Sequence, residues 1–132
     1  MAVRLLLFGL GLFHAANALI MLAFPERWAA AVVHVATPSH LEFHFIADIG
    51  MAFLASGAAL LWSARRGPAF ASWAIAGAVW PALHAMIHLH EWAADGLPST
   101  TADILNEGIG VILTGVAGIL LAWLRQRKGG TQ

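Results

Sequence analysis

Residues 3–24 read VRLLLFGLGLFHAANALIMLAF, an apolar run with one charged residue, Arg4. A helix that rises ~1.5 Å per residue crosses the ~30 Å hydrocarbon core of a bilayer with about 20 such residues. Arg4, the apolar run and the small residues at 16–18 also imitate a cleavable signal peptide, but the apolar stretch continues to Phe24, which is long enough to span. We therefore interpret residues 3–24 as a transmembrane helix.

Three more apolar segments of spanning length follow, at about 41–64, 68–93 and 101–124, before a polar tail at 125–132. Each segment should be helical, because lipid offers no hydrogen bonds to an exposed backbone. The last two connections are short, so neighbouring helices should run in opposite directions. The sequence thus predicts an all-α membrane protein, in which residues 1–132 form a single domain, an antiparallel up-down bundle of four transmembrane helices.

Local signals mark where two of these helices begin. Ser39 and Glu42 have the spacing of a capping box, in which each residue's side chain bonds the other's backbone N–H. Thr100 and Asp103 repeat this spacing before the fourth segment. Pro81 is expected to kink the third helix, because proline removes a backbone hydrogen bond from the helix interior.

The composition excludes several classes of function. Hydrophobic residues make up 60% of the chain and charged residues 11%, which is too apolar for a soluble domain of this size. Cysteine is absent, so disulfides, thiolate metal sites and thiol catalysis are excluded. The seven basic residues equal the seven acidic ones in number, and they form no basic stripe of the kind that binds nucleic acid.

The basic residues predict the orientation in the membrane. Six of the seven fall on the side shared by both termini and the second connection: Arg4, Arg65, Arg66, Arg125, Arg127 and Lys128. Only Arg27 falls on the other side. Because basic residues concentrate on the cytoplasmic side, both termini should be cytoplasmic. We predict an integral protein of a cell membrane, the inner membrane in a bacterium.

Polar and ionisable residues within the four segments lie at similar depths. Counted at ~1.5 Å per residue, six of them lie roughly 8–15 Å from the outer ends of their helices: His14, Asn17, Asp48, His84, His88 and Glu107. Three others lie closer to the outer surface: His44, Glu91 and Asp103. Their spacings of three and four residues give each helix one polar stripe. We expect the stripes to face the bundle interior, continued by Ser56 on the second helix and by Gly110, Thr114 and Gly118 on the fourth.

Such a layer is typical of a metal site. An ionised carboxylate near the membrane centre costs on the order of 2.5–3.5 kcal/mol, whereas a well-made zinc site contributes on the order of 10 kcal/mol. Imidazole and carboxylate without cysteine favour zinc or iron, and the number of candidates also fits a dinuclear site. The predicted ligands are His14, His44, Asp48, His84, His88 and Glu107.

The residue types leave some of the roles open. Glu107 and Asp48 could each be a ligand or a catalytic general base. Asn17, Glu91 and Asp103 are expected to orient the ligands by hydrogen bonds from outside the metal's coordination sphere.

Three classes of function are compatible with this pattern. The favoured one is a metal-dependent membrane oxidoreductase or hydrolase acting on a small apolar or lipid-like substrate. An alternative is a haem b electron carrier with two of the histidines at 14, 44, 84 and 88 as axial ligands, although this leaves the deep carboxylates without a role. A proton or metal-ion transporter or sensor is less favoured, because the inner half offers only Ser56, Ser72 and Thr114 as polar side chains. Association of several copies is left open.

Overall fold

The computed structural model describes residues 1–32 and 39–129, and within those ranges all regular structure is helical. Among these residues, four helical segments are long and apolar enough to cross a membrane, which confirms the number predicted from the sequence. They are Ala2–Ala23, Glu42–Ser63, Pro68–Asp95 and Thr101–Arg127. Their bounds differ from the predicted ones by only a few residues.

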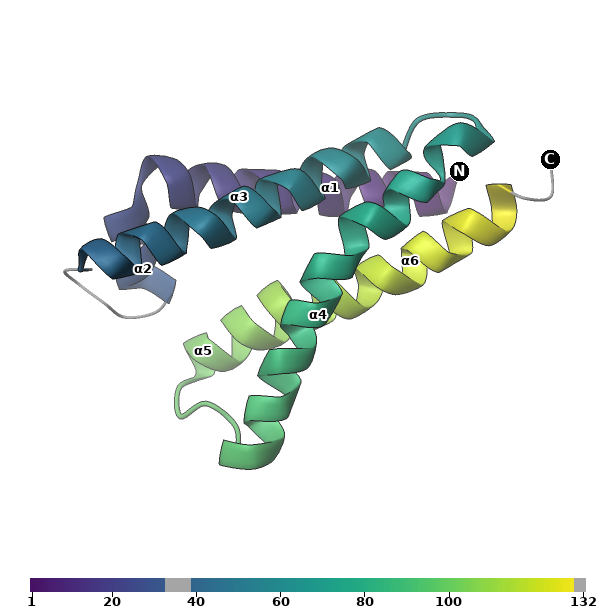
Figure 1. The fold of residues 1–132 in the computed structure, drawn as a ribbon. Coiled ribbons are helices and arrows are strands. Elements are labelled where there is room, and N and C mark those ends of the chain that lie inside the picture. The colour runs from purple at the N-terminus through teal and green to yellow at the C-terminus, as the bar shows by residue number, and fades with distance from the viewer. Residues whose placement is uncertain (33–38, 130–132) are drawn as a thin grey trace.

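The elements follow one another as a series of helices (Figure 1). The first three are α1 (Ala2–Ala23), the short α2 (Pro25–Val32) and α3 (His40–Ser63). A 3₁₀ turn, η1 (Pro68–Phe70), then leads into α4 (Ser72–Asp95). The fourth span is not one α-helix: it consists of α5 (Thr101–Leu105), the π-helix η2 (Asn106–Leu113) and α6 (Thr114–Gly129). Because α6 continues to Gly129, most of the predicted polar tail is helical.

The predicted helix starts are present. Glu42 accepts a hydrogen bond from the Ser39 backbone N–H at 2.6 Å, and the Ser39 hydroxyl accepts one from the Glu42 N–H at 3.3 Å, which completes the capping box. The Thr100 hydroxyl accepts from the Asp103 N–H at 3.1 Å and donates to the Asp103 carboxylate at 2.6 Å. Both caps satisfy N–H groups that would otherwise lack partners at a helix start.

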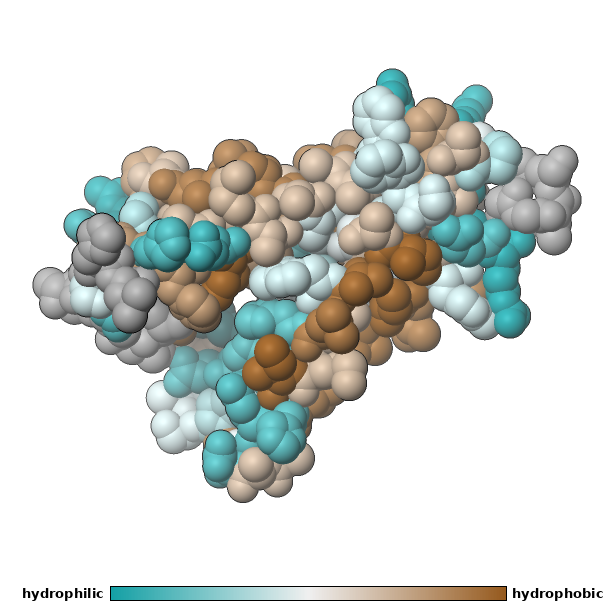
Figure 2. All heavy atoms as spheres, in the orientation of Figure 1, coloured by the Kyte–Doolittle hydropathy of each residue, from teal (hydrophilic) through white to brown (hydrophobic). Residues whose placement is uncertain are grey.

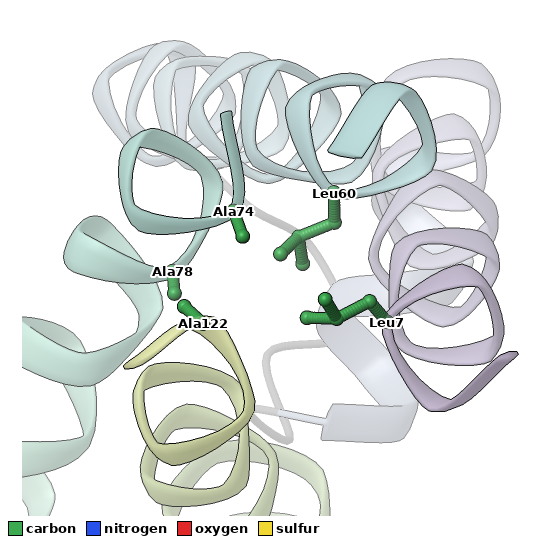
Figure 3. Close-up of a cluster of buried hydrophobic side chains, with 5 residues drawn as sticks. All are labelled: Leu7, Leu60, Ala74, Ala78 and Ala122. Atoms are coloured by element: carbon green, nitrogen blue, oxygen red, sulfur yellow. The ribbon is translucent and has the colours of Figure 1, made fainter. Parts of the chain in front are cut away.

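The helices pack as two pairs that meet at one end. α1 lies along α3, α4 lies against η2 and α6, and the contact between α3 and α4 joins the pairs. The pairs converge near both termini and the α3–α4 connection, and they spread apart towards α2 and α5 (Figure 1). At the converging end one apolar cluster draws on all four spans, and its side chains point towards one another (Figure 3): Leu7, Leu60, Ala74, Ala78 and Ala122.

Small residues allow the helices to approach closely, as is usual in membranes. A Cβ added at Gly57 of α3 would lie 2.8 Å from the backbone nitrogen of Ala15 in α1. One added at Gly115 of α6 would lie 2.5 Å from the carbonyl oxygen of Pro81 in α4. The sequence placed the ridge of the fourth span at Gly110, Thr114 and Gly118, but a Cβ at Gly110 would meet nothing within 4 Å. The prediction was therefore wrong for Gly110, and the tightest contact is at Gly115. Gly118 is packed as predicted, since a Cβ added there would lie 3.2 Å from the Leu10 side chain.

Two arginines fasten the converging end. The guanidinium of Arg125 is buried and donates to the carbonyls of Ser63, Arg65 and Gly67 at 3.4, 3.1 and 2.9 Å. Arg4 donates to the carbonyl of Ala64 at 2.7 Å. The first and last helices are thereby tied to the end of α3 and the connection that follows it.

Candidate functional site

The predicted ligands on α3 lie on its outer surface. His44 Nε2 is 3.4 Å from Asp48 Oδ2, and the two side chains are 71% and 67% exposed. The sequence placed them on an inward stripe with Ser56. At 3.6 residues per turn, however, each i,i+4 step drifts by about 40°. After three such steps Ser56 faces α4, where its hydroxyl donates to the Gly77 carbonyl, while His44 and Asp48 face away. The inward placement of this pair was therefore wrong.

His14 is the most buried of the predicted ligands, and it lies among rings. Its side chain has no exposed surface, and within the described part of the chain neither ring nitrogen has a hydrogen-bond partner. Its ring stacks on Phe53 at 5.2 Å between centroids, and Phe13 meets it edge-on at 5.6 Å. Asn17, one turn along α1, instead accepts a hydrogen bond from the Trp28 indole at 3.1 Å. Neither residue contacts the carboxylates.

On α4 the predicted stripe is present as a row of rings. His84 stacks on Trp80 with centroids 5.1 Å apart, and His88 meets His84 edge-on at 4.9 Å. Phe53 connects this row to His14, because its ring also lies 4.8 Å from Trp80. A continuous run of aromatic rings thus extends from the buried middle of the bundle to His88.

The end of this row is where histidine and carboxylate from two spans meet. His88 Nδ1 lies 3.4 Å from Glu91 Oε2 and 3.4 Å from Glu107 Oε2. The His88 and Glu107 side chains are 22% and 30% exposed. The Nδ1 atom itself is buried and has no hydrogen-bond partner among the described residues. Asp103, also predicted to assist the site, bonds the Thr100 hydroxyl at the start of α5.

Trp92 positions Glu107, a role that the sequence reading missed. Its indole N–H donates to Glu107 Oε2 at 2.5 Å. A Cβ added at Gly108 would lie 3.2 Å from the Trp92 ring, so the missing side chain there leaves room for the indole over η2. Trp92 was not among the predicted site residues. Its spacing of four residues from His88 was the signal that could have revealed the role.

Glu107 stands in a π-helix, which is a rare local structure. Such wide turns occur mostly as short bulges within α-helices, and they are frequent at functional sites. Residues 106–113 take this form here, and Thr114 at its end donates to the carbonyl of Gly110 at 2.7 Å. The wider turns change the direction in which Glu107 points relative to the α-helix that the sequence predicted.

The predicted ligands do not form one cluster. They separate into the exposed pair on α3, the buried His14, and the group at the C-terminal end of α4. Within residues 1–32 and 39–129, no three histidine or carboxylate side chains are arranged so that they could hold one metal ion. Counting residues along the chain could not predict this separation, for two reasons. Side chains spaced by four residues drift around their helix, and the two helix pairs diverge (Figure 1).

The divergence leaves a hollow between α1–α3 and α4–α5, which is visible in the space-filling view (Figure 2). Hydrophilic residues gather over α4 and α5 on this face, below an apolar band along α4. A separate cavity of about 300 Å³ lies at the turn between α1 and α2, lined by residues 23–27, and it includes none of the predicted site residues. Comparisons of this chain with protein-family models, with curated proteins and with solved structures found no match.

Proposed function

We propose that this chain is an integral membrane metalloprotein with antiparallel spans, both termini in the cytoplasm and a metal site at the outer end of α4. Four apolar segments support the membrane assignment. Six of the seven basic residues belong to the end that carries the termini, which supports the orientation. All seven acidic residues belong to the opposite half and would attract cations there: Glu26, Glu42, Asp48, Glu91, Asp95, Asp103 and Glu107.

The strongest support comes from the imidazole of His88. Its buried Nδ1 lies 3.4 Å from a carboxylate oxygen of Glu91 and from one of Glu107, too far for a good hydrogen bond. Two atoms that each bind a tetrahedral zinc ion at ~2.0–2.2 Å stand roughly 3.3–3.6 Å apart. Each of these distances is the one expected of two ligands that share an ion. The three side chains as they stand do not converge on one point, so binding would require the carboxylates to rotate.

The surrounding residues fit a catalytic rather than a closed structural site. His88, Glu91 and Glu107 would hold the ion, with the neighbouring His84 or a water molecule as a further ligand, and zinc or iron suits these donors. Trp92 holds Glu107 in place from outside the coordination sphere. A metal-activated water or oxygen at this position would act on a small apolar or lipid-like molecule entering from the hollow, as a hydrolase or an oxidoreductase does.

The other two classes receive less support from the geometry. For haem b, His14 and His84 are histidines of different helices, but the Phe53 ring lies between them, 5.2 Å from the first and 6.2 Å from the second. For transport, polar side chains would have to continue towards the cytoplasm. Ser56 and Thr114 are instead bonded to backbone carbonyls of the helices.

Metal analysis tests the proposal directly. Protein purified in mild detergent without added metal is expected to contain zinc or iron by elemental analysis, and its melting temperature should fall on chelation, because an ion that binds only the folded state stabilises it. His88→Ala and Glu107→Gln should each lose the metal. His90→Ala is the matched control, since His90 is an exposed histidine on the same helix. Equal metal content in all three variants would exclude this site, and a Soret band in the optical spectrum would favour haem instead.

A further inference from the structure

One face of α3 is exposed along the length of the helix. Its residues follow one another at steps of four, three, four, three and four, and all are exposed: His44, Asp48, Met51, Ala55, Ala58 and Trp62. We call this face the α3 seam. At about 100° per residue it lies roughly opposite Phe53, which packs against His14 and Trp80. The α3 seam therefore points away from the rest of the chain.

The neighbouring helices occupy the other sides of α3. α1 packs closely at Gly57, and α4 approaches at Ser56, whose hydroxyl bonds the Gly77 carbonyl. The steps of four and three average 3.6 residues, the period of a straight α-helix, so these side chains stay on one face along its length. Ala55 and Ala58 at the centre of the α3 seam are small enough for a second helix to approach closely.

The polar end of the α3 seam indicates what covers it. His44 and Asp48 lie within a predicted span and are mostly exposed, and an ionisable group facing hydrocarbon is unfavourable unless it finds a partner. In a parallel pair of helices that pack knobs into holes, each Asp48 would enter a hole formed by four residues of the facing helix, one of which is the preceding seam residue, His44. A second copy of this chain, inserted in the same direction, thus offers an imidazole to each carboxylate.

We propose that two copies of this chain associate through the α3 seam as a parallel, two-fold symmetric dimer. The two-fold axis makes the interface self-complementary, because His44 of each copy meets Asp48 of the other. The dimer does not depend on the proposed metal site, which lies beyond the opposite side of α3. It also gives His44 and Asp48 a role that the metal site does not.

Disulfide trapping tests this dimer cleanly, because the chain contains no cysteine. Met51→Cys, Ala55→Cys and Ala58→Cys, each made singly, should give a disulfide-linked product of twice the chain mass when membranes of the expressing cells are mildly oxidised. Met86→Cys on α4 is the matched control, since Met86 is 64% exposed and Met51 57%. The control should stay monomeric.

A second measurement addresses the polar pair. Asp48→Ala introduced into the Ala55→Cys variant should reduce the trapped fraction several-fold while the metal content of the protein stays unchanged. Trapping that is equal at Met86, or absent from all three seam positions, would overturn the dimer. So would a trapped product whose mass shows a different protein as the partner. None of these outcomes bears on the metal analysis, so the two proposals fail separately.

Discussion

Gly115→Ala tests whether α6 packs against α4 in the register seen in the structure. The added Cβ would lie 2.5 Å from the Pro81 carbonyl oxygen and 2.7 Å from the Ala85 Cβ. Backbone and a short side chain cannot move aside, so α4 and α6 must separate. Overpacking of this kind costs about 1–3 kcal/mol, and the better helix propensity of alanine returns about 0.5–1 kcal/mol. We expect a net loss on the order of 1–2 kcal/mol in the free energy of unfolding.

The assay is unfolding in detergent micelles, followed by circular dichroism. Gly9→Ala is the matched control, because a Cβ there meets nothing within 4 Å and alanine should leave the stability unchanged or slightly raised. Gly110→Ala discriminates between the two registers. A continuous α-helix would place Gly110 on the packed ridge, whereas in the structure its Cβ meets nothing within 4 Å. If Gly110→Ala lowered the stability more than Gly115→Ala did, both the π-helix and the packing of Gly115 on α4 would be refuted.

Three further predictions concern single side chains. Ser56→Ala removes a 2.5 Å hydrogen bond between α3 and α4 and should lower the free energy of unfolding by about 0.6–1.7 kcal/mol in a denaturant titration; a larger loss would mean that Ser56 does more than form this bond. Arg125→Met should destabilise the protein clearly more than Arg127→Met, because Arg125 is buried and bonded to three carbonyls whereas Arg127 is exposed; equal melting temperatures would contradict the fastening role. Trp92→Phe keeps a ring but removes the donor to Glu107, so elemental analysis should show reduced metal retention, while the chelated variant and the chelated wild type should melt at the same temperature; full retention would deny Trp92 its positioning role.

The four spans and the helix starts could be predicted from the sequence, because hydropathy and capping depend on residues that are close together in the chain. Four apolar runs gave the four segments, since each needs only enough residues to cross the bilayer. Ser39 and Glu42 gave the start of α3, because the capping box is complete within four residues. The meeting of His88 with Glu107 was predicted in part, since both were placed at similar depths on adjacent helices.

The direction in which each side chain points was harder to predict, because the error in its angle around the helix axis grows along the helix. Spacing of four residues identifies neighbours reliably over one turn, as with His44 and Asp48. Over three turns the row winds around the helix, so Ser56 and His44 end on different sides of α3. Depth alone also could not show that the helix pairs diverge, which leaves His14 with Phe53 rather than with a carboxylate.

The π-helix decides which faces of the fourth span meet α4. At about 100° per residue, Glu107 and Gly115 would lie roughly 80° apart. Each residue of a π turn covers a smaller angle, so η2 changes this separation. In the structure both residues face α4, where Glu107 bonds Trp92 and Gly115 packs on Pro81. A π-helix is less favourable than an α-helix and persists only where other contacts stabilise it. The bond to Glu107 and the tight packing at Gly115 are contacts of this kind, one within η2 and one just after it, and they stabilise the π-helix beside the proposed site.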